Sequence, residues 1–181
     1  MSGIVELKTE RLILRQWKKK DYPYFAKMNA DPDVMEFYPS TLTQSESNAM
    51  ADRIKAFIIE RSWGFWAVEV IETGQFIGFV GLHKPTYDLP VTPCVEIGWR
   101  LAKEHWGSGY ATEAGKAALE FAFNVLGLKE IYSFTSVGNY RSRAVMERLG
   151  LHNTKVNFEH PIIPEGSPLR EHVLYKGISI N

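Results

Sequence analysis

The segment VEIGWRLAKEHWGSGYATEA, residues 95–114, decides which fold this sequence is expected to adopt. It begins as a β-strand, in which Glu96 and Arg100 point to the same face because side chains alternate along a strand. Gly107 and Gly109 follow, and a helix starts directly after them. The first turn of a helix presents unpaired backbone N–H groups and the positive end of the helix dipole. Because glycines let a ligand approach the backbone closely, the segment predicts an anion site suited to a pyrophosphate.

Other phosphate-binding loops fit this segment less well. A Walker A loop needs a Lys followed by Ser or Thr, and the run GSGYAT contains no Lys. A dinucleotide-binding fingerprint needs a third small residue where Thr112 stands, within repeated βαβ units. Glu130 lies near the acidic position of that fingerprint, but only one βαβ unit surrounds it. A tight turn before a helix is the alternative to a ligand-binding role for Gly107 and Gly109.

Hydrophobic patterning and turn residues predict strands and helices in mixed order along the chain. Thr43 and Glu46 form a capping box at the start of one helix. Asp21, with Pro23 close behind it, is predicted as the N-cap of another, and Gly127 ends a third. This order predicts a mixed α/β sheet. The predicted strands are residues 12–17, 65–71, 76–82, 95–101, 131–135, 155–158 and 171–178, and the predicted helices are 21–30, 43–61, 111–125 and 142–149.

Length and composition are those of an ordinary globular protein. The chain has 181 residues and is 45% hydrophobic and 23% charged, so we expect a single domain over residues 1–181. Its 21 basic and 21 acidic residues give a formal net charge of zero. This balance excludes a protein that binds nucleic acid through its bulk charge, and no nucleic-acid partner is expected.

Cysteine and histidine usage excludes several kinds of site. Cys94 is the single cysteine, which excludes an intramolecular disulfide and a Cys-rich zinc site. A reducing, cytoplasmic location is expected. The five histidines show no metal-ligand spacing, so no metal is expected. We also expect neither a secretory signal nor a membrane span, because no apolar run is long enough.

Trp106, Gly109 and Ala111 lie in a segment that resembles motif A of the GCN5-related N-acetyltransferases (GNAT), whose pattern is Gln/Arg-x-x-Gly-x-Gly/Ala. Trp106 stands where the pattern has Gln or Arg, and this departure resembles the RimJ/RimL-type subfamily, which acetylates the N-termini of ribosomal proteins. Residues 139–151 resemble the family's later Asn-x-x-Ser/Ala segment, and residues 9–15 are similar to the subfamily's first strand. The three matches together span nearly the whole chain.

The resemblance implies a GNAT fold, a cosubstrate and a set of binding residues. The implied fold is a mixed sheet of about seven strands, flanked by about four helices and splayed between the parallel strands 95–101 and 131–135. Acetyl-CoA would lie in that opening, and no metal would be used. For Arg143 and Arg148, a position on a solvated helix face is the alternative to a contact with a phosphate. The implied cofactor-binding residues are Trp99, Leu101, Trp106, Gly107, Ser108, Gly109, Tyr110, Ala111, Asn139, Arg143 and Arg148.

Glu96 and Ser142 are the catalytic residues that the resemblance implies. A carboxylate base is found in the family at the position of Glu96, although a charge on a solvated strand face is equally compatible with the pattern. Many members carry a Tyr seven residues after the position of Asn139, but this sequence has Met146 there, which cannot donate a proton. Ser142 is the remaining hydroxyl, and we hypothesise that it protonates or hydrogen-bonds the leaving thiolate. Its alternative role is a helix cap.

The function implied is an N-acetyltransferase that moves an acetyl group from acetyl-CoA directly to an amine, first of all the α-amine of a protein N-terminus. A small amine (polyamine, amino sugar, amino acid or antibiotic) is the alternative acceptor, and a non-catalytic acyl-CoA-binding module is the alternative to an enzyme. The acceptor is expected to meet residues 31–43 and the closing strands, with Glu36, Tyr38 and Glu165 as candidate contacts. A monomer and a homodimer both remain open.

Overall fold

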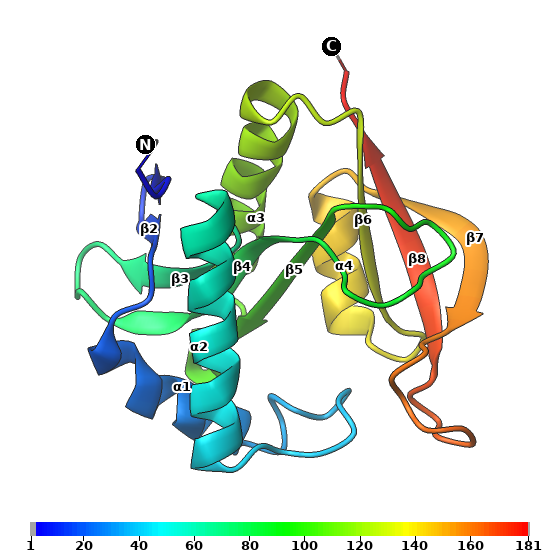
Figure 1. The fold of residues 1–181 in the computed structure, drawn as a ribbon, viewed down its shortest axis with the longest axis horizontal. Helices are drawn as coiled ribbons and strands as arrows, with labels where there is room; N and C mark the ends of the chain where they lie inside the picture. The colour runs from blue at the N-terminus through cyan, green and yellow to red at the C-terminus, as the bar shows by residue number, and fades with distance from the viewer. Residues whose placement is uncertain (1–2, 181) are drawn as a thin grey trace.

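The computed structural model describes residues 3–180, which form one mixed sheet of eight strands with four α-helices (Figure 1). The strands lie in the order β1-β2-β3-β4-β5-β6-β8-β7. They are β1 Leu7–Lys8, β2 Leu12–Arg15, β3 Phe65–Val70, β4 Phe76–His83, β5 Glu96–Leu101, β6 Glu130–Ser136, β7 His152–Glu159 and β8 Glu171–Ile178. The helices are α1 Tyr22–Asn29, α2 Gln44–Arg61, α3 Tyr110–Glu120 and α4 Tyr140–Arg148, with short helical turns at Lys19–Asp21, Lys103–His105 and Phe121–Val125.

β5 and β6 are the one parallel pair among the strands of the described residues; every other neighbouring pair is antiparallel. The two strands pair at a single register, with Glu96 opposite Tyr132. One residue further along each strand, the Ser133 hydroxyl donates a hydrogen bond of 2.9 Å to the Ile97 carbonyl. Beyond this point the strands diverge (Figure 1). The mixed α/β fold with an opening between two parallel strands is therefore confirmed.

Helices cover both faces of the sheet. α1 and α2 pack together and against β3 and β4, whereas α3 packs against β2, β4 and β5. Phe65 and Trp66 are consecutive in β3, so their side chains point to opposite faces. Phe65 packs on Phe79, which contacts Phe25 of α1 at 6.0 Å between ring centroids. Trp66 instead packs edge-on against Phe121, at the end of α3.

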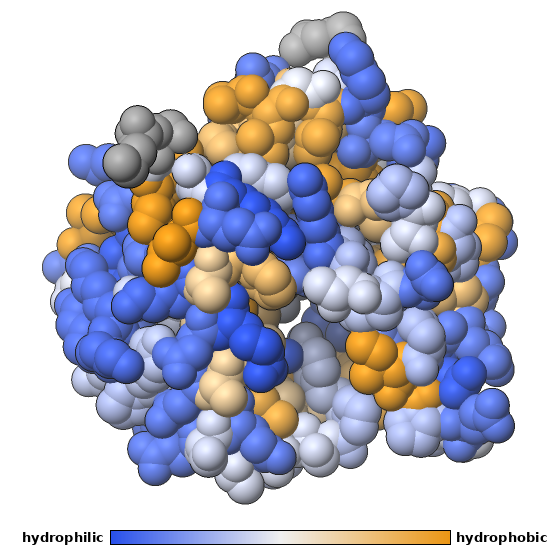
Figure 2. All heavy atoms as spheres, viewed as in Figure 1, coloured by the Kyte–Doolittle hydropathy of each residue, from blue (hydrophilic) through white to orange (hydrophobic). Residues whose placement is uncertain are grey.

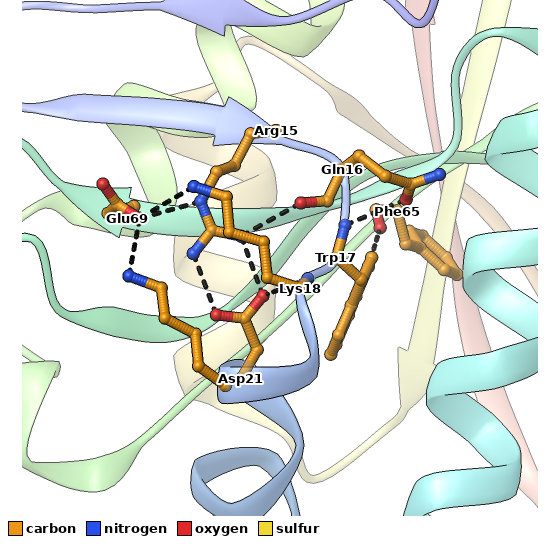
Figure 3. Close-up of polar contacts among 8 residues, drawn as sticks. Arg15, Gln16, Trp17, Lys18, Asp21, Phe65 and Glu69 are labelled. Atoms are coloured by element: carbon orange, nitrogen blue, oxygen red, sulfur yellow. Dashed lines mark hydrogen bonds and ion pairs between the residues drawn. The ribbon is translucent and has the colours of Figure 1, made fainter.

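A buried cluster of charges joins β2, β3 and the start of α1 (Figure 3). Arg15 donates two hydrogen bonds of 2.8 and 2.9 Å to the Asp21 carboxylate and one of 2.8 Å to Glu69. Asp21 immediately precedes α1, as predicted, but its side chain makes no hydrogen bond to that helix. It accepts instead from the backbone N–H of Lys18 at 2.7 Å. The capping role predicted for this carboxylate is corrected, because Arg15 holds it in the core.

Two other helix starts show how local signals set the elements. The capping box is confirmed: the Thr43 N–H donates to the Glu46 carboxylate at 2.7 Å, and the Glu46 N–H donates to the Thr43 hydroxyl at 3.2 Å. α4 begins at Tyr140, two residues before the predicted Ser142. The reason is that Asn139 is the N-cap, and its side-chain carbonyl accepts from the Ser142 N–H at 3.3 Å.

Some boundaries differ from the prediction. The two-residue strand β1 was not predicted, because two residues carry no alternation. The predicted helix 111–125 begins at Tyr110 and changes to a π-helical turn at Phe121. β7 is longer than predicted, and its pairing with β8 is interrupted around Lys155, whose φ is +63°. None of the helices in residues 3–180 is both long and apolar enough to span a membrane.

Candidate active site

The divergence of β5 and β6 opens a cavity of about 1580 Å³. Figure 2 shows the surface hollowed near the middle of this face, beside α2. Its walls come from α2, β5, β6, α4, the N-terminal turn of α3 and the loop between α1 and α2. Cavities that hold one small ligand usually measure about 300–1,000 Å³. The volume is therefore larger than one small ligand needs.

One end of the cavity is the glycine loop that precedes α3. Gly107 and Gly109 have φ of +75° and +79°, a conformation that glycine adopts without strain. None of the hydrogen bonds in residues 3–180 is donated by a backbone N–H between 107 and 112. A Cβ added at Gly107 would meet no described atom within 4 Å. The loop therefore presents free N–H donors and open space at a helix N-terminus, which is what an anionic group such as a pyrophosphate requires.

Two contacts hold this loop in place. The Trp106 indole N–H donates to the Leu101 carbonyl at 2.9 Å, which folds the loop back on the end of β5. Glu113, in the first turn of α3, accepts from the Thr9 hydroxyl at 2.6 Å and from the Arg11 N–H at 2.8 Å. Arg11 also lies over the Tyr110 ring, 4.5 Å from its centroid. The predicted Trp106, Gly107, Gly109, Tyr110 and Ala111 all line the cavity.

The edge of β5 is the second feature of the cavity. One side of β5 pairs with β4 along its full length, while the other side pairs with β6 only at Glu96. Residues 98–101 therefore present an unpaired strand edge between the splayed strands. Trp99 and Leu101 line the cavity, as predicted. An extended ligand can add to such an edge as an extra strand would.

Glu96 lies where β5 and β6 separate, half-buried in the cavity wall. No hydrogen bond from another described residue reaches its carboxyl group. Burial raises the pKa of Glu96 to about 8, because the charged form loses hydration without a compensating partner. Such a carboxyl group can accept a proton from an amine near neutral pH.

Other titratable groups around Glu96 stay neutral. Burial, with a smaller contribution from Glu96, raises the pKa of Cys94 to about 11, so this thiol is a poor nucleophile at neutral pH. Burial lowers the pKa of His83 and of His160 to about 4, and both line the cavity as neutral imidazoles. Within residues 3–180, no group of three or more His, Cys, Asp or Glu is placed to hold a metal ion.

Ser142 and Asn139 lie on the α4 side of the cavity, across from β5. Ser142 is held at the third position of α4 by the bond from its backbone N–H to Asn139, and it is one of the residues that line the cavity. The Asn139 amide also donates to the Thr135 hydroxyl at 2.9 Å. Both ends of this amide are thus used inside the protein. Met146 is buried and does not line the cavity.

Of the remaining predicted cofactor-binding residues, one lines the cavity and two do not. Arg148 lines the cavity and is exposed, so its guanidinium is free to meet a phosphate. Arg143 points elsewhere: it donates to the Val137 carbonyl at 2.8 Å and does not line the cavity. Ser108 also lies outside the cavity lining.

The α1–α2 loop reaches across to α4. Glu36, a candidate acceptor contact, pairs with Arg141 at 3.1 Å, and Arg141 lies over the Trp106 ring at 4.1 Å from its centroid. Tyr38, a second candidate, lines the cavity. Glu165, the third, does not. Arg141 therefore links the loop between α1 and α2 to the glycine loop.

Sequence reasoning missed the contribution of α2 to the site. Arg53, Phe57 and Arg61 line the cavity from this helix. Their spacing of four residues places them on one helical face, and this was the signal that could have revealed them. Arg61 also lies over the Phe57 ring at 4.6 Å.

Comparison with known proteins finds the domain family that the sequence resemblance implied. The family described as "Acetyltransferase (GNAT) domain" matches residues 11–152. YkkB, an uncharacterized protein of Bacillus subtilis, is 30% identical over 158 residues, 86% of this chain and 90% of YkkB. The FsC-acetyl coenzyme A-N(2)-transacetylase of Aspergillus fumigatus is 30% identical over 159 residues, 84% of this chain and 67% of that protein.

Solved structures are similar over almost their whole length. A GNAT-family acetyltransferase of Bacillus anthracis superposes with a TM-score of 0.79 at 24% identity, covering 96% of this chain and 98% of that one. The ribosomal-protein-S5-alanine acetyltransferase of Vibrio fischeri superposes with a TM-score of 0.75 at 16% identity, covering 98% of each. At these identities the likeness concerns the fold.

Proposed function

Since this chain belongs to the acetyltransferase (GNAT) domain family, we propose that its cavity brings acetyl-CoA and a primary amine together for direct acetyl transfer. The chain is an acetyl-CoA-dependent N-acetyltransferase. The observation that carries the proposal is that Glu96 of β5, Ser142 of α4 and the glycine loop before α3 all line the same cavity. A base, a hydrogen-bond donor and an anion site are then available to one reaction.

The features of the cavity fit acetyl-CoA as a substrate. The free N–H groups of residues 107–112 would hold its pyrophosphate, and Arg148 would meet a phosphate group. The unpaired edge of β5, at residues 98–101, would pair with the amide groups of the pantetheine arm. Arg143 was predicted in the same role, but it lies outside the cavity lining and donates to the Val137 carbonyl, which supports a structural role. Ser108 also lies outside the lining, so it would contribute only its backbone N–H.

The proposed chemistry needs few side chains. The amine nitrogen attacks the thioester carbonyl carbon, a C–N bond forms, and the C–S bond breaks. The Glu96 carboxylate takes the proton that the amine loses. The Ser142 hydroxyl donates a hydrogen bond to the leaving thiolate, which is then protonated by water. Cys94 is a poor nucleophile here, which supports direct transfer without an acyl-enzyme.

Two acceptor classes are supported by different observations. The α-amine of a protein N-terminus is the first candidate, supported by the RimJ/RimL-like segment 106–114 and by the fold shared with a ribosomal-protein acetyltransferase. A small-molecule amine is the second, supported by the 30% identity to a relative whose name describes transfer from acetyl coenzyme A to an N(2) position of FsC.

The experiment is free-CoA release from acetyl-CoA, measured with two acceptor panels. One panel holds peptides with N-terminal Ser, Ala or Met, and the other holds polyamines, amino sugars and free amino acids. Turnover on peptides, with mass spectrometry placing the acetyl group on the α-amine, is the expected result for the first candidate. Turnover confined to small amines selects the second candidate. CoA binding without release on either panel would overturn the proposed transfer and favour a binding module.

A further inference from the structure

Arg100 is a buried positive charge in the cavity wall without an acidic partner. Its side chain is 93% buried and lines the cavity from β5, on the same strand face as Glu96. One Nη atom donates to the Asn29 side-chain carbonyl at 2.8 Å. The Nε atom is buried and unpartnered, and no carboxylate of the described residues lies within ion-pair distance.

Arg15, the other buried arginine of the described residues, differs from Arg100 in its partners. Arg15 is equally buried, but it is paired with two carboxylates, Asp21 and Glu69 (Figure 3). Burying a charge without an opposite charge is costly, so buried arginines are normally paired. The stacking of Arg100 on Tyr38, at 4.2 Å from the ring centroid, offsets only part of that cost. A bound ligand remains as the source of the missing negative charge.

The surroundings hold Arg100 ready for such a ligand. Asn29 is fully buried, and its own amide donates to the Ser47 hydroxyl at 2.9 Å, so the acceptor of the Arg100 bond is itself fixed. Tyr38 comes from the loop between α1 and α2. A planar guanidinium held in this way suits two-point binding of a carboxylate or a phosphate.

The position of Arg100 points to the acceptor rather than to acetyl-CoA. Its partners Asn29, Met50 and Tyr38 belong to α1, α2 and the loop between them, whereas α3, with the glycine loop at its N-terminus, packs on the other face of the sheet. On the same side, α2 adds Arg53 and Arg61 to the cavity lining. Arg61 pairs with Glu60 at 3.7 Å, whereas Arg53 and Arg100 have no acidic partner among the described residues, so this part of the wall is positively charged at two residues.

We propose that Arg100 binds an acidic group of the acceptor, so that the substrate is an amine that also carries a carboxylate or phosphate. The proposal rests on the proposed acetyl transfer for the identity of the second substrate. It disfavours polyamines and other purely cationic amines, which the arginines would repel. Glu96 and Arg100 are four positions apart along β5, roughly 13 Å between their Cα atoms at the usual rise of a strand. Acceptors with several bonds between amine and acid are therefore favoured.

The test compares acceptors that differ only in the acid. One arm pairs 6-aminohexanoate with 6-aminohexanamide, and the other pairs peptides with Asp or Asn at the third residue. Wild-type protein is expected to favour the acidic member by about 10- to 100-fold in kcat/KM, as for a hydrogen bond to a charged group. The arm that shows the preference distinguishes a small acceptor from a peptide. Equal rates within both pairs would overturn the proposal.

Variants of Arg100 test whether this residue causes the preference for acidic acceptors. Arg100→Gln should abolish it by slowing the acidic acceptor, with the KM for acetyl-CoA unchanged. If that variant does not fold, Arg100→Lys keeps the charge but loses the planar fork, and should reduce the preference. Lys27→Gln removes an exposed charge from α1 outside the cavity lining and should change neither value. A raised KM for acetyl-CoA with both acceptors would overturn the proposal by assigning Arg100 to a CoA phosphate.

A binding measurement separates this proposal from the proposed function. In the presence of CoA, 6-acetamidohexanoate should raise the thermal unfolding midpoint of the wild type more than its amide does, and Arg100→Gln should lose the difference. This result without any turnover would uphold the acid site and overturn the transfer reaction. Turnover at equal rates within both acceptor pairs, and without any such difference, would uphold the reaction and overturn the acid site.

Discussion

At the scale of single residues, the partners of each buried side chain decide whether it is charged and what it can do. Glu96 has a raised pKa because its carboxyl group is buried without a partner, whereas the carboxylate of Glu113 keeps three hydrogen-bond donors from Thr9 and Arg11. The first is therefore available for proton transfer, and the second anchors α3. The same contrast separates Arg100 from Arg15.

Glu96 should impose a pH dependence on the reaction. The base is the carboxylate, and with a pKa of about 8 its fraction rises as the pH rises through that value. Glu96→Gln should lower kcat/KM by about 10²–10⁴-fold at high pH. Because both enzymes share the titration of the amine substrate, the ratio of wild type to variant isolates Glu96. That ratio should rise from pH 6 through 8, where half of Glu96 is ionised, and level off only at higher pH.

The matched control is Glu104→Gln, which changes an exposed carboxylate outside the cavity lining. Its kcat/KM should follow the wild-type profile at every pH. A wild-type to Glu96→Gln ratio that stays constant from pH 6 to 9 would remove Glu96 as the base.

Ser142→Ala should lower kcat while leaving the KM for acetyl-CoA unchanged. The expected loss is on the order of tenfold, below the usual effect of a general acid, because a thiol with a pKa near 8.5 is already a good leaving group. The backbone N–H of Ser142 makes the helix-capping bond, so the alanine variant should keep its stability. Ser142→Thr restores a hydroxyl and should recover part of the rate. Wild-type kcat in the alanine variant would exclude the hydroxyl from the reaction.

At the scale of elements, the glycine loop and α3 form one unit. The helix begins directly after two glycines with positive φ, and the loop is tied to β5 by Trp106 and to the segment before β2 by Glu113. The free N–H groups are thereby held in fixed positions. Binding of an anion should depend on this backbone conformation more than on any side chain of the loop.

Gly107→Ala tests this dependence against a matched glycine. Gly74, in the β3–β4 turn, also has positive φ and open space around it, but it lies outside the cavity lining. Either alanine should lower the free energy of unfolding by about 1–2 kcal/mol, through the strain of a left-handed backbone. Only Gly107→Ala should also raise the KM for acetyl-CoA, by on the order of tenfold, since its Cβ projects into the space for the ligand. Equal KM values in the two variants would contradict the assignment of the loop.

At the scale of the molecule, the sheet consists of two parts that meet at few points. β1 to β5 form one part and β6 to β8 the other, joined through the register of Glu96 with Tyr132 and the hydrogen bond from Ser133 to Ile97. The Arg141–Glu36 ion pair adds a contact across the cavity. A substrate that binds between the two parts would therefore supply hydrogen bonds to strand edges that the protein leaves unpaired.

Acetyl-CoA should accordingly stabilise the whole molecule. At 100 times its Kd, a ligand of the folded state adds about 2.7 kcal/mol to the free energy of unfolding. Hydrogen exchange should slow at residues 98–101, whose edge of β5 is unpaired, and less in the β7–β8 hairpin. Slowed exchange confined to the first turn of α3 would show that the strand edge takes no part in binding.

The sequence by itself determined the features that depend on near neighbours. The Thr43–Glu46 capping box, the β3–β4 turn and the helix start after Gly109 each involve residues within a few positions of one another. Such interactions form with the same partners in any fold, so the pattern predicts them. The order of these elements predicted the mixed sheet, and the resemblance of residues 106–111 to a known motif implied its opening.

Only the tertiary structure decided which side chains face the cavity. Arg143 and Arg148 lie on the same short helix, yet one is bound to the Val137 carbonyl and the other lines the cavity. Arg100 meets Asn29 across 71 residues of sequence, and its lack of a carboxylate depends on every element packed around it. Burial and charge pairing are sums over distant segments, so no local pattern contains them.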